Sequence, residues 1–522
     1  MVLHPSYTQT LDGYYSRSGG PWDVPPLPTL LDRSDAGAWS IRDGTTLLDG
    51  RAVTSLSRSL ASTLLQLGTR KGDVVAWQMP NWHESVLLFR ACWSVGAIAL
   101  PLHHKLREAD IAPVMDLLHP KVTFAPPGAP LGEVRPGISV RNPTSESWTQ
   151  ALGTREVNQA PIEPTDLALA MMTSGSTGAP KVVLHSHRAL AYKAMSKPAI
   201  YGLGSKDCVL VPGPLSHING IVNAVLVPPI AGMNAVLMEA WDPEQAIRLV
   251  ESEGVTFLGG ASTFLSGMVE SAGFSLRRVR SLRLVAMGGS SMSTGTIASL
   301  AETLGCSVKR TYGATEAPSI TTAHAGDPPM RGWETDGRPS GEAEVRISDP
   351  TTGSALRHGE TGEIWVRGPE LFAGYAIPEQ TTTSIQDGWF RTGDLGSVDE
   401  EGWLTVRGRI KELIIRGGEN ISPGEVEALV RSHPSVQDTA VVGFPDRILG
   451  ERVAAVVVAD PAFTLQTCRE WFAGQKVAKF KTPEMVMHVP SIPLLATGKP
   501  DKIELRRLVL HKAAEVQARS DT

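Results

Sequence analysis

A run of nine residues, Thr173–Lys181, combines the residue types that bind a polyanion. Its glycines let backbone N–H groups approach phosphate oxygens closely, its hydroxyls donate hydrogen bonds, and its lysine adds a positive charge. Pro180 stands where a Walker loop has its second glycine, so the run is of another type. A Ser/Gly surface turn is the alternative for such a run taken alone. The predicted phosphate ligands are Thr173, Ser174, Gly175, Ser176, Thr177, Gly178 and Lys181.

The stretches on both sides of this run are apolar, and both are typical of β-strands rather than helices. We therefore expect no helix N-terminus after the loop to add its dipole to the phosphate site. Further short motifs follow downstream in a definite order, and each is weak when taken alone. They are Thr311–Glu316, Arg391–Asp394, Gly408–Glu412, Gly417–Glu427 and Thr497–Lys499.

Taken together and in this order, these motifs resemble those of the adenylate-forming acyl-CoA synthetase superfamily, over about residues 40–510. The runs Trp77–Trp82 and Glu334–Pro339 are most similar to its cyclohexanecarboxylate and medium-chain acyl-CoA ligases. We expect both runs to lie away from the acyl pocket. The resemblance implies an AMP-forming carboxylic acid–CoA ligase that uses ATP, Mg²⁺ and coenzyme A. Because a carboxylate is a poor electrophile, such an enzyme first joins it to the α-phosphate of ATP, and a thiol then attacks the acyl-adenylate.

The resemblance also implies roles for individual residues of the Tyr312–Glu316 motif. Tyr312 would stack on adenine, and Gly313 would let the backbone approach the acyl carbonyl. Thr315 would donate a hydrogen bond to the α-phosphate. Glu316 would hold Mg²⁺, a hard cation that prefers carboxylate and phosphate oxygens. An ordinary turn followed by a helix cap is the alternative for this motif in isolation.

Two further sites for the nucleotide come from the same resemblance. Asp394 follows a turn glycine, so we expect its carboxylate on a loop, where it could accept both ribose hydroxyls, with Arg409 in support. A simple β-turn aspartate is the alternative. Gly289 and Ser290 match the place where relatives contact adenine, although the usual proline is Ser or Met here.

The C-terminal motifs imply a moving part. Lys499 matches the catalytic lysine that reaches the α-phosphate during adenylation, and Lys411 matches the hinge about which the small domain turns. A surface turn is the usual setting of an isolated Gly-Lys pair. The segment that lines the CoA tunnel would contribute Gly417, Gly418 and Glu419.

The acyl pocket is expected around His217, which matches a gating residue, although a lone histidine is more often structural. Asn219, Val222 and Asn223 would form walls with the small residues Gly259, Gly260 and Ala261, which hint at room for a bulky acid.

A stand-alone adenylation protein that loads a carrier-protein thiol is the main alternative function. An adenylate-using oxygenase or a non-catalytic relative are others. Amino-acid adenylation domains usually carry an aspartate that corresponds to Pro214–His217, a stretch without a carboxylate. No carrier motif follows residue 510, so CoA is favoured. The acid remains open: alicyclic, medium-chain, aryl or steroid-derived.

The order of hydrophobic patterns predicts the elements that must position these residues. Helix and strand alternate over 50–125 and again over about 187–310, which favours parallel sheets covered on both faces. Expected helices are 53–66, 82–95 and 107–118, and expected strands are 74–79, 97–102, 121–124, 209–212, 235–238, 255–258 and 282–286.

The fold class is thus α/β: a large N-terminal domain of doubly wound sheets with a small β-rich subdomain after residue 335, and a mobile small α+β C-terminal domain. We place the N-terminal AMP- and acyl-binding domain at 1–408, the hinge at 409–411 and the C-terminal domain at 412–522. Ser422 is expected to cap the first helix of the small domain, with Glu425 completing a capping box.

Composition fits an enzyme of small molecules. The 522 residues exceed one core, so two or more domains are expected. A net charge of −5 and the lack of a basic run argue against nucleic acid. The four cysteines have no C-x-x-C spacing, which favours a reducing compartment. We find no signal peptide and no membrane span, and therefore expect a cytoplasmic protein, possibly homodimeric, as some relatives are.

Overall fold

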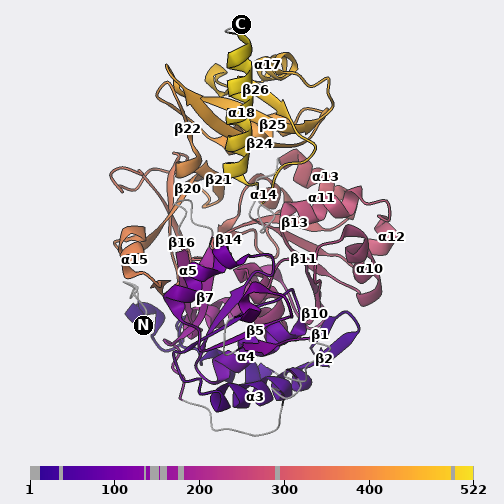
Figure 1. Cartoon of the computed structure of the whole chain (residues 1–522), viewed down its shortest axis with the longest axis vertical. Helices are drawn as coiled ribbons and strands as arrows, with labels where there is room; N and C mark the ends of the chain where they lie inside the picture. Colours follow the sequence, from indigo (N-terminus) through magenta and orange to yellow (C-terminus); the bar gives the residue numbers. More distant parts are fainter. Residues whose placement is uncertain are drawn as a thin grey trace. The chain divides into compact units, whose positions relative to one another are not determined.

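The computed structural model describes residues 12–34, 39–133, 137–141, 148, 152, 161–173, 181–288, 294–475, 477–494 and 500–520 (Figure 1). It divides into two compact units. The larger unit comprises Met1–Gly288, Ala298–Val345 and Trp365–Arg391, and the smaller unit comprises Gly289–Ile297, Arg346–Ile364 and Thr392–Thr522. The proposed hinge at 409–411 and the boundaries on either side of it stay predictions.

Two large sheets form the larger unit. The first has seven strands in the order β18-β8-β7-β4-β3-β5-β6. Strands β7, β4, β3, β5 and β6 run parallel, whereas β8 and β18 are antiparallel to their neighbours. Their bounds are β3 Val74–Gln78, β4 Ile98–Leu102, β5 Val122–Ala125, β6 Gly137–Ser139, β7 Leu167–Thr173, β8 Lys181–Ser186 and β18 Gly374–Tyr375.

This sheet is buried on both faces, as a parallel sheet requires. Along β3, Val75 and Trp77 join one core cluster with residues of α3 (Gly50–Gln66) and α4 (His83–Ser94). The alternate residues Val74 and Ala76 join a second cluster with residues of α5 (Glu108–Leu118). Because side chains alternate along a strand, the two faces of β3 thus pack into two separate cores. The expected helices and strands of residues 50–125 are confirmed.

The second sheet has nine strands in the order β15-β14-β13-β12-β11-β9-β10-β1-β2. Its six central strands, from β13 to β1, are parallel. The bounds are β1 Ser40–Asp43, β2 Thr46–Asp49, β9 Cys208–Val211, β10 Asn234–Leu237, β11 Phe257–Gly260, β12 Leu284–Met287, β13 Ser307–Tyr312, β14 Thr321–Thr322 and β15 Arg338–Pro339. The four strands expected between residues 209 and 286 are all present, each within two residues of its expected bounds.

The remaining helices of this part of the chain connect the strands. They are α1 Asp12–Tyr15, α2 Leu27–Ser34, η1 Pro130–Glu133, α7 His187–Tyr201, α8 Ile218–Ile221, η2 Val222–Leu226, α9 Val227–Ala231, α10 Pro243–Glu253, α11 Ser262–Glu270, α12 Leu276–Val279, α13 Thr294–Leu304, α14 Pro329–Glu334 and α15 Pro378–Ser384. Segment η2 is a π-helix, in which Val227 N–H bonds the carbonyl of Val222 five residues back. Such turns are rare and occur often at functional sites.

The β-rich segment expected after residue 335 is also present. It consists of β16 Glu344–Ser348, β17 Gly362–Arg367, β19 Ile385–Gln386, β20 Trp389–Val398 and β21 Leu404–Arg409. The order is β16-β17-β20-β19, with β21 paired to β20. The division between the two units falls within β16, β17 and β20.

An α+β fold completes the smaller unit. Its strands are β22 Ile414–Arg416, β23 Glu419–Ile421, β24 Val436–Asp446, β25 Gly450–Ala459 and β26 Met485–His488. Its helices are η3 Ile410–Glu412, α16 Pro423–Arg431, α17 Leu465–Gly474, η4 Lys479–Lys481 and α18 Lys502–Ser520. Leu505 and Val509 of α18 pack on β24 and β25 (Figure 1).

The expected capping box at the start of α16 is wrong. Ser422 is the N-cap residue, but its side chain makes no cap hydrogen bond, because its hydroxyl donates to the carbonyl of Arg407 instead. Glu425 accepts a hydrogen bond from Lys481 at 2.6 Å, an ion pair from another segment of the smaller unit. Both Ser422 and Glu425 therefore bond to residues that are distant in sequence instead of to the first turn of α16.

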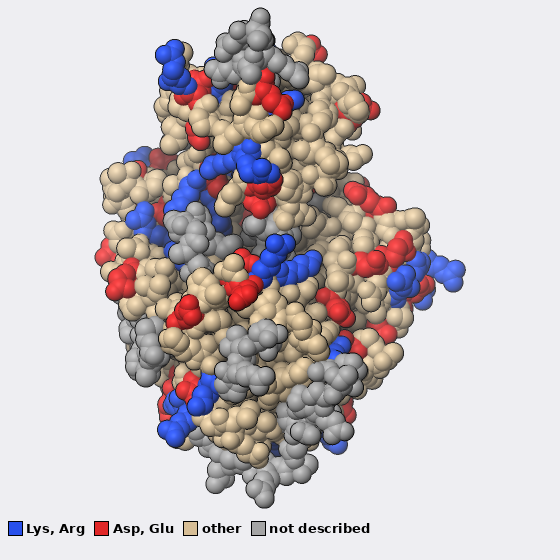
Figure 2. All heavy atoms as spheres, in the orientation of Figure 1, with Lys and Arg blue, Asp and Glu red and all other residues tan. Residues whose placement is uncertain are grey.

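The surface charges in Figure 2 are mixed in sign, and the four cysteines form no disulfide bonds. Lys and Arg lie interspersed with Asp and Glu on the face shown in Figure 2. All four cysteines are free. No helix in the described ranges is long and apolar enough to cross a membrane.

Candidate active site

Several predicted residues lie at one edge of the nine-stranded sheet. Strands β9, β11, β12 and β13 are parallel neighbours, so their carboxyl ends share that edge. The loop that contains His217 follows β9, Gly259 and Gly260 end β11, and Tyr312 ends β13. Ligands of open α/β sheets bind at this edge. The topology therefore brings the predicted acyl-pocket residues and the Tyr312–Glu316 motif to the same edge of the sheet.

The first sheet contributes the ends of the glycine-rich loop. Thr173 ends β7, Lys181 begins β8, and the two residues are paired across the antiparallel strands. The expectation of flanking strands is confirmed. The predicted ligands Ser174, Gly175, Ser176, Thr177 and Gly178 lie outside the described residues.

Tyr375 connects Lys181 to Glu316. The Tyr375 hydroxyl donates a 2.6 Å hydrogen bond to Glu316 Oε1, and Lys181 Nζ lies 4.7 Å from the centre of the Tyr375 ring. Burial, and then the negative charge of Glu316, raise the pKa of Tyr375, so the hydroxyl keeps its proton. The Glu316 carboxylate thus accepts a hydrogen bond from the hydroxyl of this buried tyrosine, and the Lys181 ammonium group lies near its ring. Tyr375 was not among the predicted site residues, because the two-residue strand β18 carries no periodic signal.

His185 of β8 supports the same motif from the other side. Its ring is fully buried, and its Nε2 lies 2.8 Å from the carbonyl oxygen of Thr315. Burial lowers the pKa of His185 to about 4, so the neutral ring donates this bond near neutral pH. The backbone N–H of Phe372 donates to the carbonyl of Glu316 at 2.9 Å. The backbone on both sides of the Thr315–Glu316 bond is therefore fixed by other elements.

Gly313 is required by the fold of the motif itself. A Cβ there would lie 2.4 Å from the backbone nitrogen of Ser319. Ser319 in turn accepts a 3.2 Å hydrogen bond from Lys193, which also forms a buried ion pair with Glu370 at 3.1 Å. Removing either member would leave a buried charge without its partner, which is strongly destabilising.

The loop before His217 is held by Asn81. Its side chain donates to the carbonyl of Gly213 and accepts from the N–H of Leu215, both at 2.8 Å. We expected the run Trp77–Trp82 to lie away from the acyl pocket, yet Asn81 contacts the loop that contains the predicted pocket residue His217. The run begins within β3 of the other sheet.

His217 is half-buried at the start of α8. It lies close enough to His103 to contribute, after burial and His104, to the lowering of the His103 pKa to about 4.

The expected pocket walls are close together, but the glycines leave little empty space. A Cβ on Gly259 would lie 2.8 Å from Asn223 Nδ2, and one on Gly260 would lie 2.6 Å from the Phe264 ring. The room expected at these glycines is therefore occupied by neighbouring side chains. Val222, the first residue of η2, is buried, whereas Asn219 is exposed.

The smaller unit contains the predicted ribose site. Asp394 and Arg409 are paired residues of β20 and β21, and Arg409 Nε donates to Asp394 Oδ1 at 3.0 Å. Asp394 is only 7% exposed. Our expectation of a loop is wrong here, because Asp394 lies inside β20. Gly393 has a φ of +72°, and its N–H donates to the side-chain carboxylate of Glu363 in the neighbouring strand β17.

Lys411 is exposed in η3. Gly417 and Gly418 join β22 to β23 with φ angles of +59° and +88°. Two positive φ angles in a two-residue hairpin loop favour glycine. The hairpin alone therefore explains both glycines, and it presents Glu419 at its exposed end. Gly289, Ser290 and Lys499 lie outside the described residues.

Two other features of the larger unit are candidates for a binding site. A hollow lined by Arg283, Lys309 and His324 lies at the amino ends of β12 and β13, which is the edge opposite the motifs.

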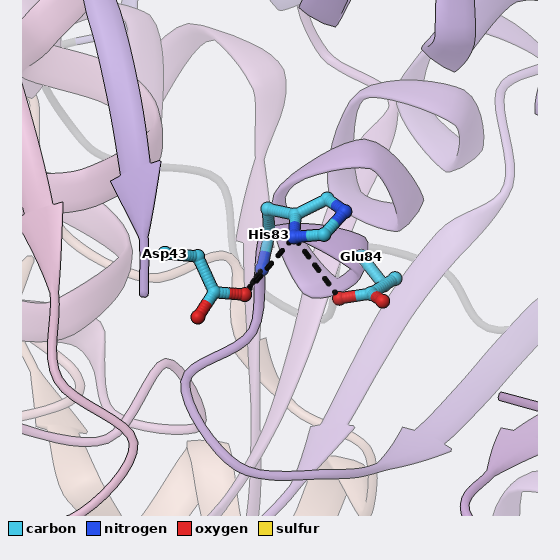
Figure 3. Close-up of side chains that lie close together, drawn as sticks. All are labelled: Asp43, His83 and Glu84. Carbon is cyan, nitrogen blue, oxygen red and sulfur yellow. Dashed lines mark hydrogen bonds and ion pairs between the residues drawn. The ribbon is translucent and has the colours of Figure 1, made fainter. Parts of the chain in front are cut away.

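Asp43, His83 and Glu84 form the second feature, a cluster with the donor atoms of a cation site (Figure 3). Arg141 occupies that role: its guanidinium bonds Asp43, and bonds Glu84 at 2.6 and 2.7 Å. The cluster ties β1, the start of α4 and residue 141 together, and we assign it to structure.

Comparisons with known proteins show the family to which the chain belongs. Residues 34–376 match the family described as AMP-binding enzyme, and residues 425–499 match the AMP-binding enzyme C-terminal domain. The chain is 29% identical over 489 residues to the medium-chain fatty-acid–CoA ligase of Escherichia coli (strain K12), covering 89% of this chain and 86% of that one. It is 33% identical over 489 residues to triostin synthetase I of Streptomyces triostinicus, covering 89% and 91%. The crystal structure of ATP-bound MatB from Rhodopseudomonas palustris superposes with a TM-score of 0.85 at 27% identity, covering 92% and 99%.

Proposed function

The chain belongs to the AMP-binding enzyme family, the adenylate-forming acyl-CoA synthetases, and from that premise we propose that it joins a carboxylic acid to CoA. In the first step a carboxylate oxygen attacks the α-phosphorus of ATP, the bond to the bridging oxygen breaks, and pyrophosphate leaves. In the second step the CoA sulfur attacks the acyl carbon, AMP leaves, and the thiol proton passes to solvent.

The arrangement of Lys181, Tyr375 and Glu316 is the observation that carries this proposal. Transferring an adenylyl group requires positive charge on the leaving phosphates and a fixed place for the counter-ion that accompanies them. Lys181 supplies the first, and Glu316 supplies the second. Tyr375 contacts both groups, so both lie beside the same side chain before the nucleotide binds.

Glu316 fits a magnesium ligand. Its Oε1 already accepts the Tyr375 hydrogen bond, which orients the carboxylate and leaves Oε2 for a hard cation. When bound, Mg²⁺ would neutralise charge on the phosphate oxygens. Thr315 would donate to the α-phosphate, with its backbone held by His185.

The smaller unit would hold the ribose and then CoA. Asp394 accepts a hydrogen bond from Arg409, and its carboxylate would accept the ribose hydroxyls. Lys499 would bring its charge to the reacting phosphate in a site from which water is excluded, where the charge has most effect. The Gly417–Gly418 hairpin would line the path of the CoA thiol after the small domain turns at Lys411.

The test is a screen of carboxylic acids for pyrophosphate release, with and without CoA. We expect pyrophosphate release to need an acid, ATP and Mg²⁺, and thioester formation to need CoA in addition. AMP and pyrophosphate should be the nucleotide products. If ADP and phosphate were formed instead, the proposed mechanism would be wrong.

A carrier-protein thiol in place of CoA is the second candidate, because the chain also matches triostin synthetase I along most of its length. The two candidates differ in the acceptor alone. With the acid found in the screen, thioester formed on CoA at a higher kcat/KM than on a phosphopantetheinylated carrier protein supports the ligase, and the reverse order supports the carrier.

A further inference from the structure

Lys197 is a buried lysine that the proposed mechanism does not use. It lies on α7, is 3% exposed, and its Nζ donates a 2.7 Å hydrogen bond to Asn223 Oδ1. No carboxylate of the described residues forms an ion pair with it, unlike Lys193 one turn earlier, which is paired with Glu370. Burying an ammonium group without a counter-charge is unfavourable. Burial, and then the charge of Lys193, accordingly lower the pKa of Lys197 to about 7.

This lysine begins a chain of amides that leads to the surface. Asn223 Nδ2 donates to Asn219 Oδ1 at 3.0 Å, and Asn219 is exposed. The directions of these bonds follow from chemistry, because an ammonium group can only donate. Asn223 must turn its oxygen to Lys197 and its nitrogen to Asn219. The chain of amides therefore ends with the NH₂ group of Asn219, which is a donor.

The chain passes through the predicted acyl pocket. Asn219 and Asn223 stand beside Val222 on α8 and η2, and the Asn223 amide lies against Gly259, where a Cβ would come within 2.8 Å of its nitrogen. Lys197 Nζ also lies 5.8 Å from the centre of the Phe257 ring on β11. The π-helical turn of η2 brings the chain to the end of that strand.

We propose that Lys197, Asn223 and Asn219 bind an oxygen-bearing acceptor group, such as a second carboxylate, at the end of the acid remote from the reacting carboxylate. The inference rests on the proposed function and narrows its substrate class to acids with two oxygen functions. An ammonium group has three donors, and in the described part of the chain one of them is used, on Asn223. An anionic group would give Lys197 the counter-charge that the protein itself does not provide.

The experiment compares matched acids. On straight-chain and para-substituted aryl scaffolds, pyrophosphate release is measured for members that end in a carboxylate, a ketone or a methyl group. For wild-type protein we expect kcat/KM to be at least about 10-fold higher for an oxygen-bearing member than for its methyl counterpart on the preferred scaffold.

The variant Lys197→Met keeps the length of the side chain and removes the charge. We expect it to lose about 10- to 100-fold in kcat/KM for the oxygen-bearing acid. Activity on the methyl-ended acid should stay the same or rise. Lys309→Met is the matched control: Lys309 is also buried and donates to the backbone carbonyls of Ala323 and His324, so the ratio between the acids should not change.

Asn219→Ala is a second test variant in case Lys197→Met does not fold, because a substitution at the exposed Asn219 should leave the fold intact. We expect it to lower the same ratio several-fold. A ratio that is unchanged in Asn219→Ala and in every folded Lys197 variant overturns the inference, as does a wild-type preference for methyl-ended acids on every active scaffold. If folded wild-type protein released pyrophosphate with none of the acids, the proposed function itself would fail.

Discussion

At the scale of single residues, Tyr375 is the group whose importance the motifs do not indicate. It donates a hydrogen bond to Glu316 and lies under Lys181, so its hydroxyl fixes the carboxylate that we assign to Mg²⁺. A hydrogen bond to a charged group contributes roughly 1.5–3 kcal/mol. We expect Tyr375→Phe to slow acyl-adenylate formation by about 10-fold or more, measured by pyrophosphate release at saturating acid.

A double-mutant cycle shows whether Tyr375 acts through Glu316. Glu316→Gln should slow adenylation more than Tyr375→Phe, and the tyrosine change should have little further effect when it is added to Glu316→Gln. Tyr192→Phe is the control, because the hydroxyl of that buried tyrosine accepts a bond from the N–H of Glu342 instead. Additive effects in the cycle would show that the two residues act independently.

Asp394 permits a second prediction at this scale. Its carboxylate is nearly buried beside Arg409, and we propose that it accepts the ribose hydroxyls. Asp394→Ala should raise the KM for ATP by about 10- to 100-fold, the loss of hydrogen bonds to a charged acceptor, and change the KM for the acid much less. Asp399→Asn, in the same β20–β21 hairpin, should leave both constants unchanged. Equal changes in both KM values would argue for general damage to the fold.

At the scale of the elements, two buried histidines, His185 in β8 and His187 in α7, make the stability of the fold depend on pH. Burial lowers the pKa of His187 to about 3 and that of His185 to about 4. Neither ring nitrogen of His187 has a hydrogen-bond partner among the described residues. Between the unfolded pKa of about 6.5 and these values, the unfolded chain binds protons that the folded chain does not, so stability falls as pH falls.

We therefore expect wild-type protein to lose stability between pH 7 and pH 5, with about 2 kcal/mol of the loss arising from His187. His187→Leu should remove that share and should be as stable as wild type, or more so, at pH 7. The measurement is urea-induced unfolding at both pH values. His358→Leu, at an exposed loop position, should keep the wild-type pH dependence. A His187→Leu variant with the full wild-type loss would contradict the assignment.

Elements with a strong periodic pattern were predictable from sequence, and short or partner-dependent ones were not. Helices α3, α4 and α5 and the strands between them agree with expectation to within a few residues, because each buries a continuous apolar face. Strand β18 has two residues, and pairing with β8 alone defines it. Likewise, the role of Asn81 depends on a contact between two sheets that no local pattern encodes.

The same distinction holds within the candidate site. The motif residues Lys181, Thr315 and Glu316 were found because their types and order are distinctive. The residues that hold Thr315 and Glu316, namely His185 and Tyr375, come from β8 and β18 of the seven-stranded sheet, and these contacts arise only when the two sheets pack. Ser422 shows the opposite error. The local sequence predicts a capping box there, but the Ser422 hydroxyl donates to the carbonyl of Arg407 in β21 instead.

At the scale of the whole molecule, the candidate residues are divided between two compact units. Lys181, Thr315 and Glu316 belong to the larger unit, whereas Asp394 and Lys499 belong to the smaller one. Two chemically different steps, one at the α-phosphorus and the next at the acyl carbon, need two sets of groups in turn. A smaller unit that changes position between the steps would supply each set without crowding.

The last prediction separates the two half-reactions. Lys499→Ala should reduce acyl-adenylate formation by about 10²–10³-fold, as expected for one positioned charge, and still convert supplied acyl-adenylate and CoA to thioester at a near wild-type rate. Lys411→Pro should do the reverse, because proline restricts φ at the proposed pivot. Lys512→Ala, at an exposed position of α18, serves as control and should affect neither step. Each half-reaction is measured separately, with folding checked by circular dichroism. Equal damage to both half-reactions in both folded variants would show that the two steps share one arrangement of the units, because a turning smaller unit predicts opposite losses.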